Sequence, residues 1–198
     1  MTKPEAITAA ELVAASFAWG ETIYAAGTPA THKLEMDYEA MEHHPLLLWR
    51  LVKALTEETI PYKPDYIVGV PNGATGYAGA VALELSGQDD RDVFLAHLHK
   101  DESGIGFATD IDRDTASRLS KAVLVEDVFN TGKSTRQSID CIRSVGSEVV
   151  AVVAAFDRGD PMTRPDLEVP FRSMAAAYIP PDLTPGTDIL NYIEATER

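Results

Sequence analysis

The sequence predicts an α/β protein built around a parallel sheet, and two observations lead to this. Three segments rich in Val, Ile and Ala, at 66–70, 121–128 and 148–157, are short and almost continuously apolar, like strands buried on both faces. Segments with helical spacing of apolar residues separate them. Strands that alternate with helices favour a parallel sheet with right-handed crossovers. A chain of 198 residues has the size of one domain with an attached subregion.

The N-terminal part of the chain predicts two helices. Apolar residues recur at helical spacing over 6–27, where Thr8 and Glu11 form a candidate capping box and Gly27 is the expected end. A second helical pattern begins at Pro45, and proline is favoured in the first turn of a helix. We expect both helices to precede the first strand of the sheet.

The middle of the chain is less regular. After the strand at 66–70 and a loop of Pro, Asn and Gly, a helix is expected that ends at Gly87. The segment 92–99 is the next strand candidate, and the polar stretch that follows it, 100–120, has no convincing periodicity. A stretch of that length inside a compact domain is usually functional or mobile.

The C-terminal part changes in composition after its last strand. A helix is expected at 134–146, followed by the strand at 148–157. The prolines beyond it predict a segment that wraps the surface or forms an irregular cap, with a short helix at 187–196. These prolines are Pro161, Pro165, Pro170, Pro180, Pro181 and Pro185.

Charge and cysteine content argue against several classes of protein. The net charge of -14 disfavours a broad nucleic-acid-binding face, and a small anion would need backbone N–H groups, local cations or Mg²⁺. The single cysteine, Cys141, cannot form an intrachain disulfide and is expected on the inward face of a helix. The sequence has no basic start followed by an apolar run, and no apolar stretch approaches roughly 18 residues. We therefore expect a cytoplasmic protein with no membrane partner.

The segment "VLVEDVFNTGKST", residues 123–135, carries the clearest chemical information. An apolar strand leads into Glu126 and Asp127 and then into a small, polar turn. The letters "GKS" match the end of the P-loop pattern, but Asp127 stands where that pattern needs a glycine, so an NTP site is disfavoured. The turn could merely cap a helix. Its place after two acids at the end of a strand favours a sugar phosphate, with the acids near ribose hydroxyls or hydrated Mg²⁺.

This segment resembles the phosphoribosyl-pyrophosphate (PRPP) signature of the type I phosphoribosyltransferases. The stretch "DYIVGVPNGATGYAGAVA" resembles their first strand and pyrophosphate loop, and "AAFDRGD" resembles a segment of the orotate phosphoribosyltransferases. The resemblance covers about residues 20–160. It implies the type I phosphoribosyltransferase fold, a Rossmann-like parallel sheet with its core at about 60–160. A small hood would be formed by about 1–45 and 160–198.

The resemblance also implies a reaction: transfer of ribose 5-phosphate from PRPP to a base, orotate being favoured, with release of pyrophosphate and use of Mg²⁺. Glu126 and Asp127 would be catalytic, holding the ribose and, through water, the metal, and Arg158 would contact the base. Taken alone, Arg158 could also be a surface ion-pair former, and the pyrophosphate loop a plain strand-to-helix turn. Besides the acids, the PRPP-binding residues implied are Asn130, Thr131, Gly132, Lys133, Ser134 and Thr135, and the pyrophosphate loop is Pro71, Asn72, Gly73, Ala74 and Thr75.

One loop departs from the orotate enzymes, in which a mobile loop with arginine and lysine closes over the pyrophosphate of a neighbouring subunit. That arrangement implies a homodimer. Here "HLHKDESGIGF" keeps Gly104, but Lys100 is its only lysine and Asp101 stands where a second lysine is expected. Lys100 would then be the catalytic cation, and the base-contacting N-terminal segment offers only Lys33, out of register. Other candidates for the cation are His97, His99 and Arg113, although the two histidines could simply flank a strand.

Three functions remain open at this point. The first is an orotate phosphoribosyltransferase of pyrimidine biosynthesis that acts as a dimer with Mg²⁺. The second is the same reaction with another base, which would give turnover with a purine or another pyrimidine but not with orotate. The third is a non-catalytic PRPP-binding regulator, which the altered loop would permit. A nucleic-acid-binding regulator fits poorly with the charge of -14.

Overall fold

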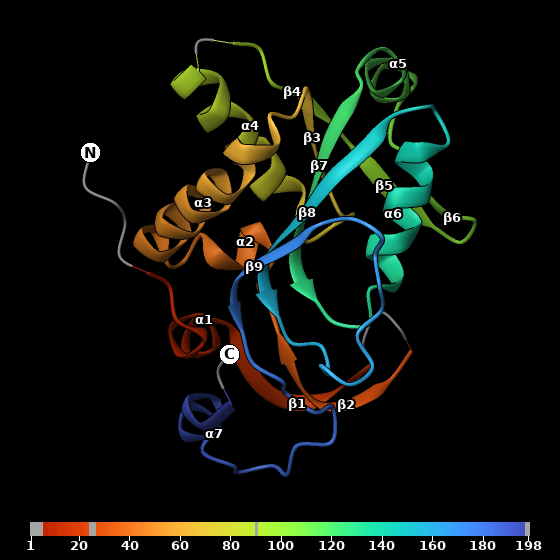
Figure 1. The fold of residues 1–198 in the computed structure, drawn as a ribbon. Helices are drawn as coiled ribbons and strands as arrows, with labels where there is room; N and C mark the ends of the chain where they lie inside the picture. Colours follow the sequence, from red (N-terminus) through yellow and green to blue (C-terminus); the bar gives the residue numbers. More distant parts are fainter. Residues whose placement is uncertain (1–5, 24–26, 90, 197–198) are drawn as a thin grey trace.

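A five-stranded parallel sheet forms the centre of the protein in the computed structural model, which describes all residues except 1–5, 24–26, 90 and 197–198. The strands lie in the order β4-β3-β7-β8-β9 (Figure 1). Every neighbouring pair is parallel, which confirms the predicted fold class. The strands are β3 (Tyr66–Gly69), β4 (Phe94–Ala96), β7 (Lys121–Phe129), β8 (Glu148–Asp157) and β9 (Phe171–Ala176).

Helices cover both faces of this sheet. In Figure 1, α3 and α4 lie on one side, and α5 and α6 lie on the other. Helix α3 begins at Pro45 as predicted, and Cys141 on α6 packs, partly buried, against the core. The helices of these layers and the short elements beside them are α2 (Tyr38–Met41), α3 (Pro45–Thr59), η1 (Ile60–Tyr62), α4 (Thr75–Asp89), α5 (Asp110–Arg118) and α6 (Lys133–Arg143).

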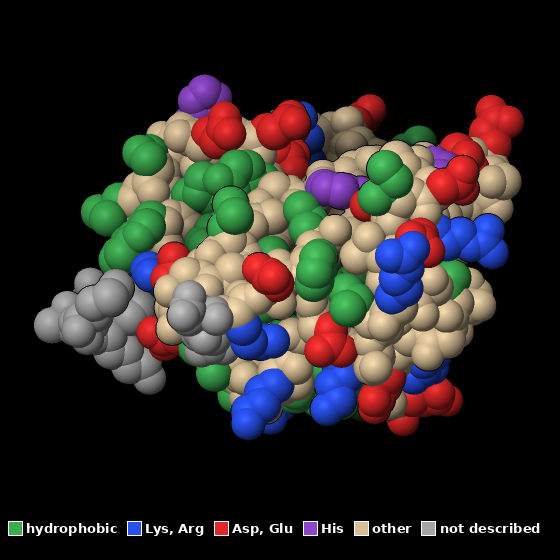
Figure 2. All heavy atoms as spheres, turned by 90° about the horizontal axis from the view of Figure 1, so that it is seen from above, with side chains coloured by type: hydrophobic (Ala, Val, Ile, Leu, Met, Phe, Trp, Pro, Cys, Tyr) green, Lys and Arg blue, Asp and Glu red, His purple; other side chains and the backbone are tan. Residues whose placement is uncertain are grey.

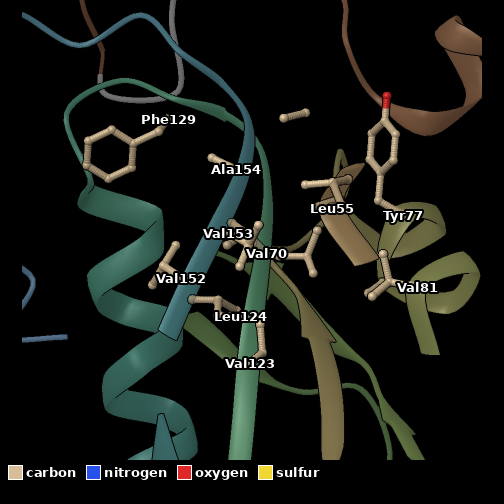
Figure 3. Packing of buried hydrophobic residues seen from close by; sticks show 14 of the residues in the cluster. Leu55, Val70, Tyr77, Val81, Val123, Leu124, Phe129, Val152, Val153 and Ala154 are labelled. Carbon is tan, nitrogen blue, oxygen red and sulfur yellow. The ribbon is translucent and has the colours of Figure 1, made fainter. Parts of the chain in front are cut away.

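The apolar runs of the sequence are explained by burial of the sheet on both faces. Successive side chains of a strand point to opposite faces. In Figure 3, Val152 lies on the side of α6, whereas Val153 lies on the side of Leu55 from α3. All three side chains are buried. The middle of a strand in this position needs apolar residues facing both sides, so 122–125 of β7 and 149–156 of β8 are continuous apolar segments.

The two ends of the chain pack together beside the sheet. Thr31 joins them: its N–H donates to the carbonyl of Pro181 at 3.0 Å, and its hydroxyl donates to the carbonyl of Leu183 at 2.7 Å. The first and last helices also contact each other (Figure 1). The elements of this part are α1 (Ala9–Ser16), β1 (Phe17–Ile23), β2 (Pro29–Leu34) and α7 (Ile189–Thr196).

The helix predicted over 6–27 is wrong in its second half. The capping box of Thr8 and Glu11 is confirmed, but the chain becomes strand β1 at Phe17 and pairs antiparallel with β2. The segment "FAWGETI" contains β-branched and aromatic residues that suit a strand, and pairing with β2 overrides the helical spacing. Part of the predicted helix, residues 24–26, lies outside the described residues.

The prediction of an irregular C-terminal segment is also incomplete. The short C-terminal helix is confirmed as α7, but the segment before it contributes the edge strand β9 to the main sheet. Pro170 directly precedes this strand, a position where the missing N–H of proline costs no ladder bond. The prolines around this segment led to the prediction of irregular structure, but they lie outside the strand and do not prevent it from forming.

The polar stretch after residue 99 is ordered into a hairpin and a helix. The single strand expected at 92–99 is two strands, β4 and β5, and β5 turns back into β6. Helix α5 follows, with only Asp112 and Ala116 buried, which explains why no apolar periodicity marked it. The two hairpin strands are β5 (Leu98–Asp101) and β6 (Gly104–Phe107). None of the described helices is both long and apolar enough to cross a membrane.

Candidate functional site

A cavity of about 320 Å³ lies where β3, β7 and β8 end, the edge at which open α/β sheets bind ligands. It brings together most of the residues singled out from the sequence: Pro71, Asn72, Gly73, Lys100, Glu126, Asp127, Arg158 and the whole turn 130–135. Of the other two, Ala74 is buried in the core, and Thr75 lines a neighbouring depression with Asp37 and Glu42. With Lys33 and Leu34 from β2, which also line the cavity, residues from five separate segments meet in one place.

Glu126 is the buried member of the acid pair. Its carboxylate accepts a hydrogen bond from the hydroxyl of Thr135 at 2.7 Å, so the end of β7 is tied to the first turn of α6. Burial, and then the neighbouring carboxylate of Asp127, raise the pKa of Glu126 well above its usual range. The ligand-free protein therefore holds a proton on Glu126 more tightly than the unfolded chain does.

This pKa shift predicts a measurable stability change. Because the folded-state pKa is the higher one, Glu126 favours the folded state at low pH and destabilises it as pH rises above the ordinary value of 4.5. The substitution Glu126→Gln mimics the protonated acid and removes this dependence. We expect the Tm of Glu126→Gln to exceed that of the wild type by a margin that grows as the pH rises above 4.5. A margin that is constant with pH, in thermal unfolding followed by circular dichroism, would contradict the shift.

The loop after β3 approaches the second acid closely. A Cβ atom on residue 73 would lie 2.9 Å from Oδ1 of Asp127 and closer still to its other two carboxyl atoms. The preceding Asn72 has a φ of 77°, and the carbonyl of Gly73 accepts a hydrogen bond from the N–H of Tyr38 at 3.2 Å. Only glycine leaves room for Asp127 at this position.

The turn between β7 and α6 leaves a helix N-terminus open toward the cavity. Gly132 is the N-cap residue, with a φ of 70°, and it has no side chain with which to cap the helix. The hydroxyl of Thr135 bonds to Glu126 instead. The alternative hypothesis, that this turn serves only to cap α6, is therefore disfavoured, because no side chain caps the helix at Gly132. The first-turn N–H groups and the helix dipole make this position suitable for a phosphate.

The β5–β6 hairpin brings one cation to that turn. Nζ of Lys100 lies 3.5 Å from Oγ of Ser134 in the same chain. The adjacent Asp101 is directed elsewhere because successive strand residues face opposite sides. Its carboxylate accepts from the N–H of Ser103 at 2.8 Å and lies 3.2 Å from Nε2 of His99. The acid that stands in place of the expected second lysine is thus engaged within the hairpin.

The other cationic candidates in this region do not line the cavity. Arg113 lines a separate depression beside Cys141. The backbone N–H of His97 donates a hydrogen bond to the carboxylate of Asp112 on α5 at 2.9 Å. His99 is engaged with Asp101. Of the residues considered from this loop, Lys100 alone lines the cavity.

Arg158 lies at the wall of the cavity and is 4% exposed, so it is not a surface ion-pair former. Its Nη2 donates to the carbonyl of Ile179 at 3.0 Å and lies 3.1 Å from Nε2 of His32. Burial, and then the charge of Arg158, lower the pKa of His32 to about 4. His32 was not identified from the sequence. The letters "PATHKL" of β2 show no alternation of apolar and polar residues that would have marked it, and its burial depends on the packing of β2.

The cavity is cationic although the protein as a whole is acidic. Four cationic side chains and two acids line it, whereas the formal net charge of the chain is -14. On the face in Figure 2, the Lys and Arg side chains of the described residues are interspersed with Asp and Glu and form no continuous basic patch. Local cations and backbone N–H groups can thus bind a small anion despite the overall charge. The four cations are Lys33, Lys100, Lys133 and Arg158.

Comparison with known proteins agrees with this arrangement. The model of the phosphoribosyl transferase domain matches residues 37–171, which hold the acid pair, the turn and Arg158. The chain is 32% identical over 142 residues to orotate phosphoribosyltransferase 2 of Mesorhizobium japonicum, across 69% of this chain and 68% of that protein.

Two solved structures have the same fold. Orotate phosphoribosyltransferase from Aeropyrum pernix gives a TM-score of 0.64 at 20% identity, covering 84% of this chain and 92% of that one. Adenine phosphoribosyltransferase from Rhodothermus marinus gives 0.57 at 17% identity, covering 84% and 96%. These two structures bear the names of different bases, so the fold alone does not choose a base. The matched domain, the relative in sequence and the contents of the cavity agree: this chain belongs to the phosphoribosyltransferase family.

Proposed function

We propose that this protein transfers ribose 5-phosphate from PRPP to orotate, releasing pyrophosphate and forming orotidine 5′-monophosphate. The observation that supports it best is the cavity itself, which combines an uncapped helix N-terminus, an acid pair and four cations at one sheet edge. PRPP carries a phosphate at one end and a pyrophosphate at the other, with a ribose between them. Each part has a matching group in the cavity.

In this proposal the turn 130–135 holds the 5′-phosphate through backbone N–H groups and hydroxyls. The pyrophosphate lies against residues 71–73, where Gly73 allows the backbone to come close. Lys100 lines the same cavity from the hairpin, beside Ser134, and adds a cation for the bound phosphates. Glu126 and Asp127 accept hydrogen bonds from the ribose hydroxyls. Anchoring both ends of PRPP places the anomeric carbon in a fixed position relative to the base.

Mg²⁺ fits this donor set as an ion shared with the substrate. Among the described residues, no group of three or more His, Cys, Asp or Glu is arranged to hold a metal, so the protein offers no complete cage. Mg²⁺ commonly keeps several waters and binds through one or two carboxylates plus substrate phosphates. Glu126 and Asp127 would contact it through water. The ion would neutralise charge on the departing pyrophosphate.

In this reaction the protein has to orient PRPP and the base and to stabilise the charge that develops as pyrophosphate leaves. The bond to pyrophosphate should break ahead of bond formation, which gives the anomeric carbon oxocarbenium character like that in glycoside hydrolysis. Asp127 lies beside the ribose in this arrangement, and Lys100, next to Ser134, adds positive charge to the cavity that holds the phosphates. No covalent intermediate with the protein is needed.

The choice of orotate is supported by cations on the base side of the cavity. Arg158 and Lys33 both line it, and Lys33 forms a surface ion pair with the half-exposed Glu35. Orotate carries a carboxylate, which such cations favour, whereas adenine and uracil carry no charge. We also propose that the packed terminal segments act as a hood over one catalytic domain, and that the enzyme works as a cytoplasmic homodimer.

The decisive experiment is release of pyrophosphate from PRPP and Mg²⁺ with a panel of free bases, each confirmed by detection of the nucleotide. Nucleotide formed from orotate would support the proposal, and exclusive use of another base would replace orotate by that base. Calorimetric binding of PRPP without pyrophosphate release from any base would instead identify a PRPP-binding regulator.

The substitution Asp127→Asn should weaken PRPP binding by about 1–3 kcal/mol, or roughly 5- to 150-fold, because a charged acceptor of the ribose hydroxyls becomes neutral. Titration calorimetry with PRPP and Mg²⁺ measures this directly. Asp140→Asn, at an exposed position on α6, is the matched control. Unchanged PRPP affinity and turnover in Asp127→Asn would end the assignment of this acid.

The substitution Lys100→Ala should raise the KM for PRPP by about tenfold, the scale expected for loss of a charged hydrogen-bond partner. Arg113→Ala removes a nearby cation that lines a different depression, and it should leave the KM unchanged. Initial rates at varied PRPP and saturating base give both values. Equal effects of the two substitutions would mean that Lys100 acts only through overall charge.

A further inference from the structure

Arg158 is held from three sides at the wall of the cavity. Its Nη2 lies 3.1 Å from Nε2 of His32 and 3.0 Å from the carbonyl oxygen of Ile179. Its backbone N–H donates to the carbonyl of Phe129 at 2.9 Å. Strand β2 and the C-terminal segment therefore hold the guanidinium, and the end of β7 holds the backbone of the same residue.

The protonation of His32 follows from the chemistry of its neighbour. A guanidinium offers only hydrogen-bond donors, so Nε2 of His32 must accept and the proton of the neutral imidazole lies on Nδ1. The low pKa of His32, about 4, agrees with a neutral ring at ordinary pH. His32 thus acts toward Arg158 as an uncharged acceptor.

The ring of His32 is itself fixed by its surroundings. The residue is 0% exposed. Its ring stacks on Phe17 with centroids 5.0 Å apart and meets Trp19 edge-on at 6.2 Å. A buried ring packed against two aromatic side chains has little freedom to turn. Nε2 is therefore presented to Arg158 in one direction.

The two bonds at Nη2 orient Arg158, and neither of them brings an opposite charge to it. A carboxylate at the position of His32 would form an ion pair and offset the positive charge. An imidazole nitrogen and a backbone carbonyl are both uncharged, so these bonds leave the charge in place. Because the guanidinium is planar and its donors form a rigid fork, fixing Nη2 also fixes the direction of its other nitrogens.

We propose that His32 is a positioning residue for the acceptor base: it holds Arg158 so that the cavity prefers a planar base with a negative charge over a neutral one. The inference rests on the proposed function, in which Arg158 contacts the base. Lys33 follows His32 in β2 and lines the same cavity, which places a second cation near that base.

The test compares two substitutions at one position. His32→Phe keeps an aromatic ring against Phe17 but has no acceptor, whereas His32→Gln keeps an uncharged acceptor of similar reach. Initial rates with orotate and with uracil, which lacks the carboxylate, give the KM for each base and for PRPP. Arg158→Gln provides the benchmark for loss of the guanidinium.

We expect His32→Phe to raise the KM for orotate by about tenfold or more, and to change the KM for PRPP by less than about twofold. The preference for orotate over uracil should fall by a similar factor. His32→Gln should recover most of both losses. A purely structural role for His32 would instead impair the use of PRPP and base together.

Each result bears on the inference. Equal rises in both KM values, or an unchanged KM for orotate in folded His32→Phe, would overturn it. If His32→Phe does not fold, His32→Asn replaces it, because its shorter amide does not reach Arg158. Wild-type protein that forms no nucleotide from any base would overturn the proposed function and this inference together. A KM for orotate that responds to Arg158→Gln but not to His32→Phe would overturn this inference alone.

Discussion

The substitution Gly73→Ala should reduce turnover of PRPP by about 100-fold while the protein remains folded, the scale for misplacing a reacting group by about 1 Å. The added Cβ would lie 2.9 Å from Oδ1 of Asp127 and closer to its other carboxyl atoms. Because those atoms end a side chain, the carboxylate can swing away without moving the backbone. The cost therefore falls on the position of Asp127 and not on the fold.

Gly87→Ala is the matched control for this substitution. Gly87 lies in helix α4, and a Cβ there would meet nothing within 4 Å. We expect it to keep wild-type turnover and to gain roughly 0.5–1 kcal/mol of stability. Both variants are compared by pyrophosphate release and by Tm. Wild-type turnover in Gly73→Ala would show that catalysis does not depend on the position of the Asp127 carboxylate seen in this structure. A large fall in Tm would indicate that the substitution impairs folding.

The substitution Arg164→Ala should lower the free energy of unfolding by about 3 kcal/mol, because it leaves a buried carboxylate without its cation. Arg164 Nη2 lies 2.7 Å from Oδ2 of Asp157, whose side chain is 3% exposed. The guanidinium also stacks over Phe171 at 4.2 Å and Phe129 at 5.3 Å. This contact holds the segment after β8 against the residues that support the phosphate turn. Because Arg164 is itself 35% exposed, the loss should lie at the low end for a buried pair.

Urea unfolding measures this loss, and Arg118→Ala serves as its control. Arg118 pairs with Asp114 on the exposed face of α5, with side chains 74% and 54% exposed, so its removal should cost no more than about 0.5 kcal/mol. Adding Asp157→Asn to Arg164→Ala should recover part of the stability, since it removes the stranded charge. If Arg164→Ala lowers the free energy of unfolding no more than Arg118→Ala does, the ion pair between Arg164 and Asp157 does not stabilise the fold more than a surface pair.

The features that the sequence predicted well are those set by neighbouring residues. The apolar runs of β3, β7 and β8 mark strands buried on both faces, and Pro45 and Thr8 mark helix starts. The order of strand, two acids and small turn predicted a sugar-phosphate site, because those residues are contiguous in the sequence. Such patterns depend on periodicity and spacing, which are visible without any long-range contact.

The errors concern segments whose structure depends on distant partners. Residues 17–23 have helical spacing but form β1 because β2 is available to pair with them. The segment 171–176 lies among prolines but becomes β9 because β8 offers a free edge. Local propensity is a weak guide where strand pairing decides the outcome.

The sequence by itself determined the α/β class, the order of the motifs and the chemistry of the acid pair and turn. Only the tertiary structure decided that Glu126 is buried with a raised pKa, that Asp101 faces away from the cavity, and that Arg158 is oriented by His32. His32 and Arg158 are 126 residues apart in the chain, and Thr31 and Leu183, which hold the two ends together, are 152 apart. Contacts of that separation leave no periodic or spacing pattern in the sequence, because they are formed by the packing of whole elements.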